Sequence, residues 1–354
     1  MIPSDISVFV SGGPDPRVPG TAFRPRASQT AFRPLAVSAT AHALLSGGGA
    51  MVRFGHRRGA TVMVPGCDLP LYLSGPGDGL LPLHIVVRHA DLDRILTLFE
   101  TDGAFRIALD LDGVRLFRTV MPGPASPAAG AGVSCDQEAV VRDIEATARW
   151  LSACSLPTGL GMPLAGLLAP KGGVPVPDAA VVLEPLRHPT ACRLRRLIGR
   201  GAGSTPAGDD ILVGALAVAR AFQGPASPLE MALKSLEPLL SNLTTRAGAG
   251  YLRMALAGEF SSHLIALVRE LGRGRTDRVL ARAARVAAHG ASSGRDTLAG
   301  VVTMARSCLE NGPGVGEVPR GCPELAGLVA ESSCQADAVH VTPPPRRVQA
   351  PPET

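Results

Sequence analysis

Residues 197–214 read LIGRGAGSTPAGDDILVG, and this stretch sets the character of the C-terminal half of the chain. Gly201, Gly203 and Gly208 can adopt the positive φ angles that let a ligand approach the backbone. Pro206 has the fixed φ that suits the first position of a helix. The apolar run that follows predicts a helix, and free amides at its start suit an anion. The stretch therefore predicts a ligand-holding loop at the start of a helix.

The start of this helix has two interpretations. A structural cap explains part of it, because the hydroxyl of Thr205 as N-cap can accept a hydrogen bond from an amide one turn into the helix. A cap needs neither Gly201 and Gly203 nor Gly208, which costs about 1 kcal/mol relative to alanine inside a helix. The surplus of glycine predicts that a ligand or another backbone segment lies close to the loop.

Asp209 and Asp210 follow the loop and are the candidate catalytic residues. Adjacent side chains on a helix point about 100° apart, so the two carboxylates can serve separate purposes. One or both can bind Mg²⁺ or a substrate amine, or both can cap the helix and accept from loop amides. The following run, ILVGALAVARAF, is apolar around much of its circumference and predicts a buried helix. Because burial makes an unpaired carboxylate costly, we expect at least one of the two to be functional.

A second motif, HGASSGRDTLAG, occupies residues 289–300. Ser293 and Asp296 have the spacing of a capping box, which by itself indicates an ordinary helix start. Combined with the first motif it offers a second set of helix N-terminal amides, and two such ends facing one pocket would bind a dianion well. The two motifs resemble each other, although no internal repeat is long enough for a solenoid. The candidate binding residues here are Ser292, Ser293, Gly294 and Asp296.

Two further side chains beside the motifs are candidates. His289 is either a general acid or base or a packed residue at a helix end. An arginine cluster leads into the first loop and either raises the local positive potential or forms a solvated helix face. It consists of Arg193, Arg195, Arg196 and Arg200. Arg200 lies inside the loop, so we include it among the candidate binding residues.

The two halves of the chain differ in their hydrophobic pattern. Between Met51 and Met121 short apolar or β-branched runs alternate with turns, and Asp112–Gly113 is a hairpin signal. Later in the chain apolar residues recur at helical spacing. The sequence therefore predicts an α+β fold, in which an N-terminal antiparallel sheet or small barrel precedes a mainly α-helical domain. The expected helices span residues 136–154, 188–198, 208–222, 229–240, 245–257, 260–271, 276–288 and 294–309.

Composition sets the expected domain boundaries. Both ends of the chain are rich in Pro and lack a sustained apolar period, which favours mobile segments. We expect a mobile N-terminal arm over residues 1–35, a β-rich domain over 36–135, a helix and a Pro/Gly-rich connection over 136–178, the motif-carrying helical domain over 179–312 and a largely disordered tail over 313–354.

Charge and composition argue against several classes of protein. The net charge is +5 and the pI about 9.0, but aromatic residues make up only 3% and no nucleic-acid-binding module is recognisable. The uncharged segment 150–170 contains too many prolines and glycines to span a membrane. The N-terminus has no basic region before its short apolar segment, which predicts a cytoplasmic protein. The seven cysteines include no Cys-x-x-Cys pair, so no structural zinc site is indicated.

Both motifs resemble those of a known family. LIGRGAGSTPAGDDILVG is similar to the signature Leu-Ile-Gly-x-Gly-x-Gly-Leu-Thr-Pro-Ser-Gly-Asp-Asp of the AllH-like family, and HGASSGRDTLAG is similar to its later Gly-x-x-Ser-Gly-x-Asp-x-Leu-x-Gly element. The resemblance is best over residues 197–309. The chain departs from the signature at Ser204, where the family has leucine, and at Ala207, where a hydroxyl is lost.

The resemblance implies a subunit of an oxamate carbamoyltransferase-like complex, found with two other proteins in anaerobic allantoin or purine breakdown. That reaction exchanges carbamoyl phosphate and oxamate with oxalurate and phosphate. Because these are anions, our hypothesis assigns Gly201, Gly203, Ser204 and Thr205 to binding a phosphate or carboxylate. An aspartate of the pair would orient an amine or a metal ion, with Mg²⁺ as the candidate.

Other functions compete with this one. In a non-catalytic subunit the glycine loops would pack against a partner while the chemistry lies elsewhere. An independent nucleotide-dependent enzyme ranks last, since the chain has no Walker-type Gly-Lys-Ser/Thr sequence.

Overall fold

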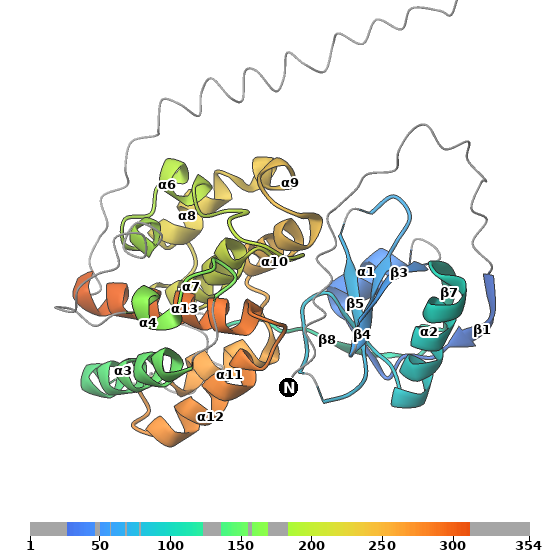
Figure 1. Cartoon of the computed structure of the whole chain (residues 1–354), viewed down its shortest axis with the longest axis horizontal. Helices are drawn as coiled ribbons and strands as arrows, with labels where there is room; N and C mark the ends of the chain where they lie inside the picture. Colours follow the sequence, from blue (N-terminus) through green and yellow to red (C-terminus); the bar gives the residue numbers. More distant parts are fainter. Residues whose placement is uncertain are drawn as a thin grey trace, which may run out of the picture.

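The computed structural model describes residues 27–46, 50–56, 58–67, 69–77, 79–122, 136–154, 158–168 and 183–311. A sheet with two helices forms the N-terminal half, and a helical half lies beside it (Figure 1). The predicted α+β class is confirmed. Residues 27–32 of the expected arm form a strand, whereas residues 1–26 and 312–354 lie outside the described ranges.

The sheet has eight strands in the order β1-β7-β3-β4-β5-β6-β2-β8. Its centre, from β7 through β3 and β4 to β5, is antiparallel, and so is the β2–β6 pair. The pairs β1–β7, β2–β8 and β5–β6 are parallel, so the sheet is mixed rather than wholly antiparallel. The strands are β1 (Ala27–Phe32), β2 (Ala36–Ser38), β3 (Ala50–His56), β4 (Gly59–Met63), β5 (Leu71–Ser74), β6 (His84–Val86), β7 (Phe105–Leu109) and β8 (Arg115–Phe117).

The Asp112–Gly113 pair forms a tight turn but not a hairpin. Gly113 has a φ of +64°, and the amide of Val114 donates to the carbonyl of Leu111 at 3.2 Å. The flanking strands pair elsewhere, β7 with β1 and β3, and β8 with β2 at the other end of the sheet. The hairpin prediction is wrong because the sheet curls, which brings its two ends within reach of the short connection 110–114 (Figure 1).

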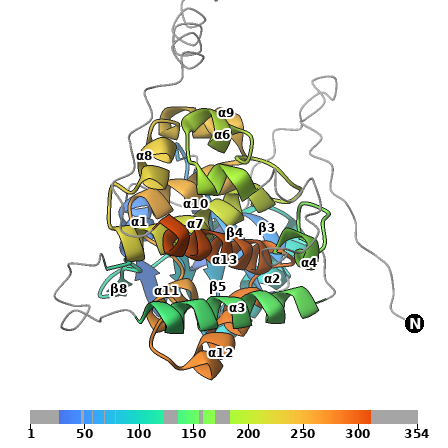
Figure 2. The same ribbon diagram turned by 90° about the vertical axis from the view of Figure 1, so that its left-hand side faces the viewer.

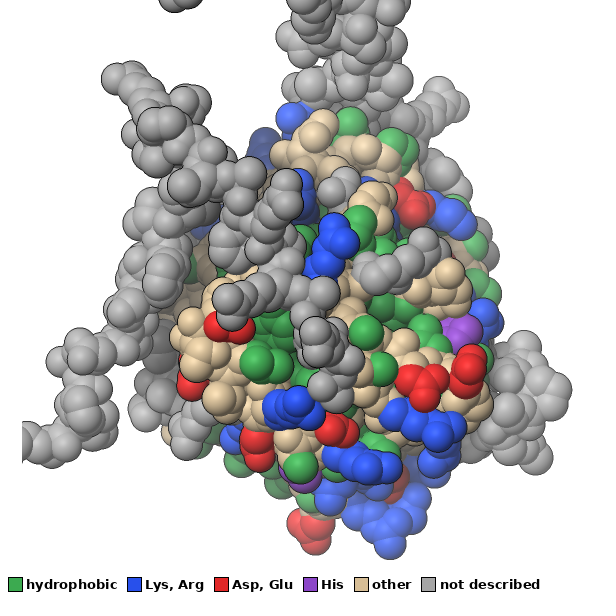
Figure 3. Space-filling view, turned by 90° about the vertical axis from the view of Figure 1, so that its right-hand side faces the viewer, with side chains coloured by type: hydrophobic (Ala, Val, Ile, Leu, Met, Phe, Trp, Pro, Cys, Tyr) green, Lys and Arg blue, Asp and Glu red, His purple; other side chains and the backbone are tan. Residues whose placement is uncertain are grey.

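Two helices of this half were not predicted. α1 (Ala39–Leu45) follows β2, and α2 (His89–Asp102) buries Leu92 and Ile95 in the core of the sheet half. Arg94 of α2 also lies 5.7 Å from the ring centroid of Phe32. On the surface of this half that Figure 3 presents, basic side chains lie beside acidic ones.

The helical half is built around α7 (Ala207–Gln223) and α13 (Ser293–Asn311), which share the core cluster of this half. Figure 2 shows α13 crossing the middle, with α3 and α12 on one side and α6, α8 and α9 on the other. The predicted burial of α7 is confirmed, because residues such as Ile211 and Leu212 are fully buried. The other helices are α3 (Gln137–Ala153), α4 (Leu164–Leu167), α6 (Ala191–Arg195), α8 (Pro228–Lys234), η2 (Glu237–Leu239), α9 (Leu240–Leu243), α10 (Arg246–Leu256), α11 (Ser262–Glu270) and α12 (Thr276–Ala287).

Backbone hydrogen bonds join the two halves. Residues 119–121 run beside residues 258–260, where the amide of Met121 donates to Gly258 at 2.9 Å and that of Phe260 donates to Thr119 at 2.8 Å. Leu80 and the start of α11 are also linked through Ser262. These contacts set the sheet against the C-terminal end of α10. None of the described helices could span a lipid bilayer.

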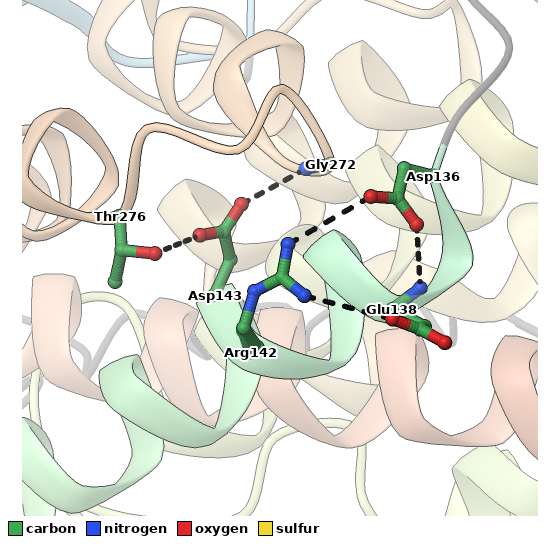
Figure 4. A network of polar contacts seen from close by, with 6 residues as sticks. All are labelled: Asp136, Glu138, Arg142, Asp143, Gly272 and Thr276. Atoms are coloured by element: carbon green, nitrogen blue, oxygen red, sulfur yellow. Dashed lines mark hydrogen bonds and ion pairs between the residues drawn. The ribbon is translucent and has the colours of Figure 1, made fainter.

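Asp143 ties α3 to the α11–α12 connection (Figure 4). One carboxylate oxygen accepts from the amide of Gly272 at 3.0 Å and the other from the Thr276 hydroxyl at 2.7 Å, and the residue is 1% exposed. The neighbouring Arg142 faces solvent, where its guanidinium lies 3.7 Å from Asp136 and 3.8 Å from Glu138.

We expect Asp143→Ala to lower the free energy of unfolding by about 2 kcal/mol, because the buried Gly272 amide and Thr276 hydroxyl lose their acceptor. Arg142→Ala is the matched control and should cost less than about 0.5 kcal/mol, since exposed ion pairs contribute little. Urea titration of both variants measures the difference. Equal losses would contradict the assigned role of Asp143.

Candidate functional site

The two glycine motifs meet where α7 and α13 cross. A Cβ atom on Gly214 would lie 1.9 Å from the carbonyl oxygen of Thr297, and one on Gly300 would lie 1.9 Å from that of Ile211. The two contacts are equivalent, because each joins a glycine of one helix to a backbone carbonyl of the other. The motifs also match in spacing: Gly208, Asp210 and Gly214 in α7 correspond to Gly294, Asp296 and Gly300 in α13. The close crossing places the starts of both helices side by side.

Each helix start is also held by a loop carbonyl. The amide of Gly208 donates to Arg200 at 2.8 Å, and that of Gly294 donates to His289 at 3.0 Å. A Cβ on either glycine would lie 1.9 Å from another carbonyl oxygen, that of Leu197 or Val286. Close contact with another backbone segment, and not with a ligand, therefore explains why glycine occupies positions 208 and 294.

The expected N-cap role of Thr205 is wrong. α7 begins at Ala207, and Pro206 precedes it with an extended ψ of 143°, so Pro206 is not the first helical residue that the N-cap interpretation requires. The Thr205 hydroxyl instead lies 3.0 Å from the hydroxyl of Ser293 at the start of α13. The two motifs thus present a shared pair of hydroxyls.

The loop before α7 is exposed from Gly201 to Ser204. Gly201 and Gly203 have φ angles of +107° and +110°, which favour glycine as predicted. The amide of Ala202 donates to Gly159 at 3.4 Å, whereas the amides of Gly203 and Ser204 donate to no residue in the described part of the chain. Two exposed amides of this loop are therefore available to a ligand.

Asp209 is a structural anchor. It is 1% exposed, and its two oxygens accept from the amide of Gly199 at 2.8 Å and from the hydroxyl of Thr244. A Cβ on Gly248 of α10 would lie 2.1 Å from its Oδ2. Burial raises the pKa of Asp209, and these two hydrogen bonds oppose the shift. Both oxygens are engaged within the protein.

We expect Asp209→Ala to lower the free energy of unfolding by about 2 to 3 kcal/mol, because it leaves two donors without an acceptor. Thr244→Val, which removes one of the two hydrogen bonds, should cost about half as much. Thermal unfolding of both variants tests this order. A stable Asp209→Ala protein would return Asp209 to the candidates for substrate contact.

Asp210 differs from its neighbour because one of its oxygens is unengaged. The residue is 9% exposed, and its Oδ2 atom is buried without a hydrogen-bond partner among the described residues. Burial raises the pKa of Asp210 well above its usual range, and the nearby Asp296 and Asp209 carboxylates raise it further. Hydrogen bonding from the Ser293 and Thr205 hydroxyls opposes this shift. The raised pKa shifts Asp210 toward the protonated form, whose hydroxyl can donate a hydrogen bond.

Asp296 occupies the matching position on α13 and is engaged. It is fully buried, and its oxygens lie 3.1 and 3.2 Å from the amide of Gly159. α13 begins at Ser293, so the carboxylate turns toward the 158–162 loop and the capping-box interpretation is wrong. Burial raises the pKa of Asp296, and hydrogen bonds from Gly159 and Ser292 and the charge of Arg295 oppose the shift. Sequence reasoning missed Gly159, whose only signal was its place in an uncharged, glycine-rich segment.

The structure thus brings Thr205, Asp210, Ser293 and Asp296 together at the paired helix starts, with Ser292 beside Gly159. Arg200 and His289 lie in the adjoining loops and are exposed. Among the residues described, no three or more His, Cys, Asp or Glu side chains are grouped as a metal site would require.

A known protein family shares the region that contains both motifs. The family model described as oxamate carbamoyltransferase subunit AllH matches residues 197–305. The resemblance to the AllH-like family is confirmed. The AllH match begins at Leu197, whose carbonyl packs on Gly208, and continues into α13, so it contains both motifs. No curated protein and no solved structure matches the chain.

Proposed function

We propose that this chain is a subunit of an oxamate carbamoyltransferase-like complex and binds an anionic substrate at the paired starts of α7 and α13. The substrate would be carbamoyl phosphate, oxamate or oxalurate, in purine or allantoin nitrogen catabolism. The observation that carries the proposal is the Oδ2 atom of Asp210, which has no hydrogen-bond partner among the described residues and lies beside the Thr205–Ser293 hydroxyl pair, inside the region that the AllH model matches.

The neighbouring groups suit a phosphate or carboxylate. Gly203 and Ser204 offer exposed amides, and Thr205 and Ser293 offer hydroxyls. The positive ends of two helix dipoles lie at the same place, which favours negative charge. Arg200 adds a cation in the loop.

A protonated Asp210 gives this site a role in carbamoyl transfer. In the reaction the amide nitrogen of oxamate attacks the carbamoyl carbon, the bond from that carbon to the phosphate oxygen breaks, and phosphate leaves with the electron pair while the nitrogen loses a proton. Negative charge develops on the carbamoyl oxygen, and a hydrogen bond from Asp210 to that oxygen would stabilise it. Asp209 and Asp296 would hold the surrounding loops in place.

Isothermal titration tests the binding step. We expect carbamoyl phosphate to bind the purified chain, or the chain assembled with its two partner subunits, with and without Mg²⁺ in parallel. Binding only with Mg²⁺ would add the metal to the site, with Asp210 Oδ2 as its protein ligand. An absence of binding in every arrangement overturns the proposal.

A non-catalytic subunit is the second candidate, and the exposed backbone of residues 201–204 favours it, because such a loop can pack against a partner. Asp210→Asn separates the two. A functional site loses turnover while the complex still assembles, whereas an interface role loses assembly first.

A further inference from the structure

The sheet half lies close enough to add residues to this site. α10 is wedged between α7 and the sheet, because Gly248 faces Asp209 while a Cβ on Gly250 would lie 3.3 Å from Leu69 and 3.6 Å from Leu83. On a helical wheel Tyr251 lies in the sector between these two directions. Its side chain therefore points toward the space between α7 and the sheet.

Tyr251 also responds electrostatically to both sides of that space. Burial raises the pKa of its hydroxyl, and the charges of Asp210 and then Tyr72 raise it further. The hydroxyl therefore stays protonated and can donate a hydrogen bond. No residue within the described ranges hydrogen-bonds to it, so this donor is available to a ligand.

The sheet presents a polar face at β5 and β6. Tyr72 and His84 are register partners in the parallel β5–β6 pair, so they share one face, and their rings stack with centroids 5.5 Å apart. Leu71, Leu73 and Ile85 alternate with them and are fully buried in the core on the other face. The chain has only two tyrosines, Tyr251 and Tyr72, and Tyr72 lies on this polar face.

His84 supports Tyr72 rather than acting as an acid or base. Its Nδ1 accepts from the amide of Leu81 at 3.4 Å, and its Nε2 lies 2.9 Å from the hydroxyl of Ser74. Burial, followed by the charge of His289 in the second motif, lowers its pKa to about 4, so the ring is neutral. A Cβ on Gly59 would lie 2.8 Å from the Tyr72 hydroxyl, so glycine leaves room for that ring.

We propose that the hydroxyl of Tyr251 donates a hydrogen bond to an oxygen of the substrate held beside Asp210, and that Tyr72, fixed by His84, is a positioning residue contributed by the sheet half. The inference rests on the proposed function. It makes the site one that both halves build, since Tyr251 points into the space between α7 and the sheet and is influenced by Asp210 of α7 and by Tyr72 of β5.

Tyr251→Phe tests the proposal with carbamoyl phosphate as the probe. We expect unchanged thermal stability and about a 10-fold weaker affinity in isothermal titration, since one hydrogen bond is lost. Tyr72→Phe keeps the ring that stacks on His84 and should weaken binding less than Tyr251→Phe does, because the proposed role of Tyr72 is to position its ring and not to contact the substrate. In that variant Tyr251 is the sole tyrosine, so a tyrosine difference spectrum on addition of carbamoyl phosphate reports on it directly.

The outcomes separate the two proposals. If the wild type binds and Tyr251→Phe binds equally well with no difference spectrum in Tyr72→Phe, the inference is wrong while the proposed function stands. If the wild type alone and in its complex binds no carbamoyl phosphate, both are wrong.

Discussion

Gly214→Ala is expected to lower the free energy of unfolding by about 3 kcal/mol or more, the largest loss of stability that the structure predicts. The added methyl group would lie 1.9 Å from the backbone carbonyl oxygen of Thr297, which cannot rotate away as a side chain can. α7 and α13 would have to separate along the crossing that fills the core of the helical half. Chemical unfolding followed by circular dichroism measures the loss.

Gly250→Ala is the matched control for this prediction. It is the same substitution in a helix, but the new methyl group would meet the flexible end of Leu69 at 3.3 Å, and alanine improves helix propensity by about 1 kcal/mol. We expect stability close to that of the wild type. Gly300→Ala should resemble Gly214→Ala, and the double variant should lose less than the sum, because one separation of the helices relieves both contacts. Equal losses in Gly250→Ala and Gly214→Ala would contradict this account.

Local signals account for what the sequence predicts well. The glycines at 201 and 203, the proline at 206 and the apolar run after them act within a few residues, so they predict the loop and α7 without reference to the rest of the chain. α2 had the same kind of signal, since Leu92, Ile95 and Phe99 recur at helical spacing. It was missed because it lies among short strands, and the apolar runs around it favoured an all-strand half.

Contacts between distant residues account for what the sequence does not predict. Gly159 engages Asp296, and Thr244 engages Asp209, across long separations in the chain. Neither pairing has a local pattern. The same holds for the parallel strand pairs and for Tyr251, which becomes a candidate only once α10 is placed between α7 and the sheet. These distant partners decide which aspartate has both oxygens hydrogen-bonded. The sequence therefore predicts the Asp209–Asp210 pair but not the different roles of its two members.

Asp210→Asn is expected to reduce carbamoyl transfer by the assembled complex by about 10-fold, because the amide N–H of asparagine is a weaker donor to the developing oxyanion than the O–H of a carboxylic acid. Asparagine has nearly the same shape as aspartate, so the surroundings of the Thr205 and Ser293 hydroxyls should not change. Assembly and overall fold should therefore be unchanged, and the loss should appear mainly in kcat. Steady-state kinetics of the reconstituted complex measures it, and full activity would remove Asp210 from the mechanism.

The same substitution should change how stability depends on pH. The pKa of Asp210 is raised in the folded protein, so its contribution to stability is complete below the unfolded value of about 3.9 and is lost as the pH rises through the folded value. The wild type therefore bears the cost of a buried charge at high pH, and Asp210→Asn should be the more stable protein there, with a gap that grows as the pH rises from about 4. Asp136→Asn removes the same charge from an exposed position and should show no such growing gap, although it weakens a cap of α3. Urea unfolding of the three proteins across this pH range separates burial of Asp210 from a general effect of net charge, because both variants remove one negative charge but only Asp210 is buried with a raised pKa.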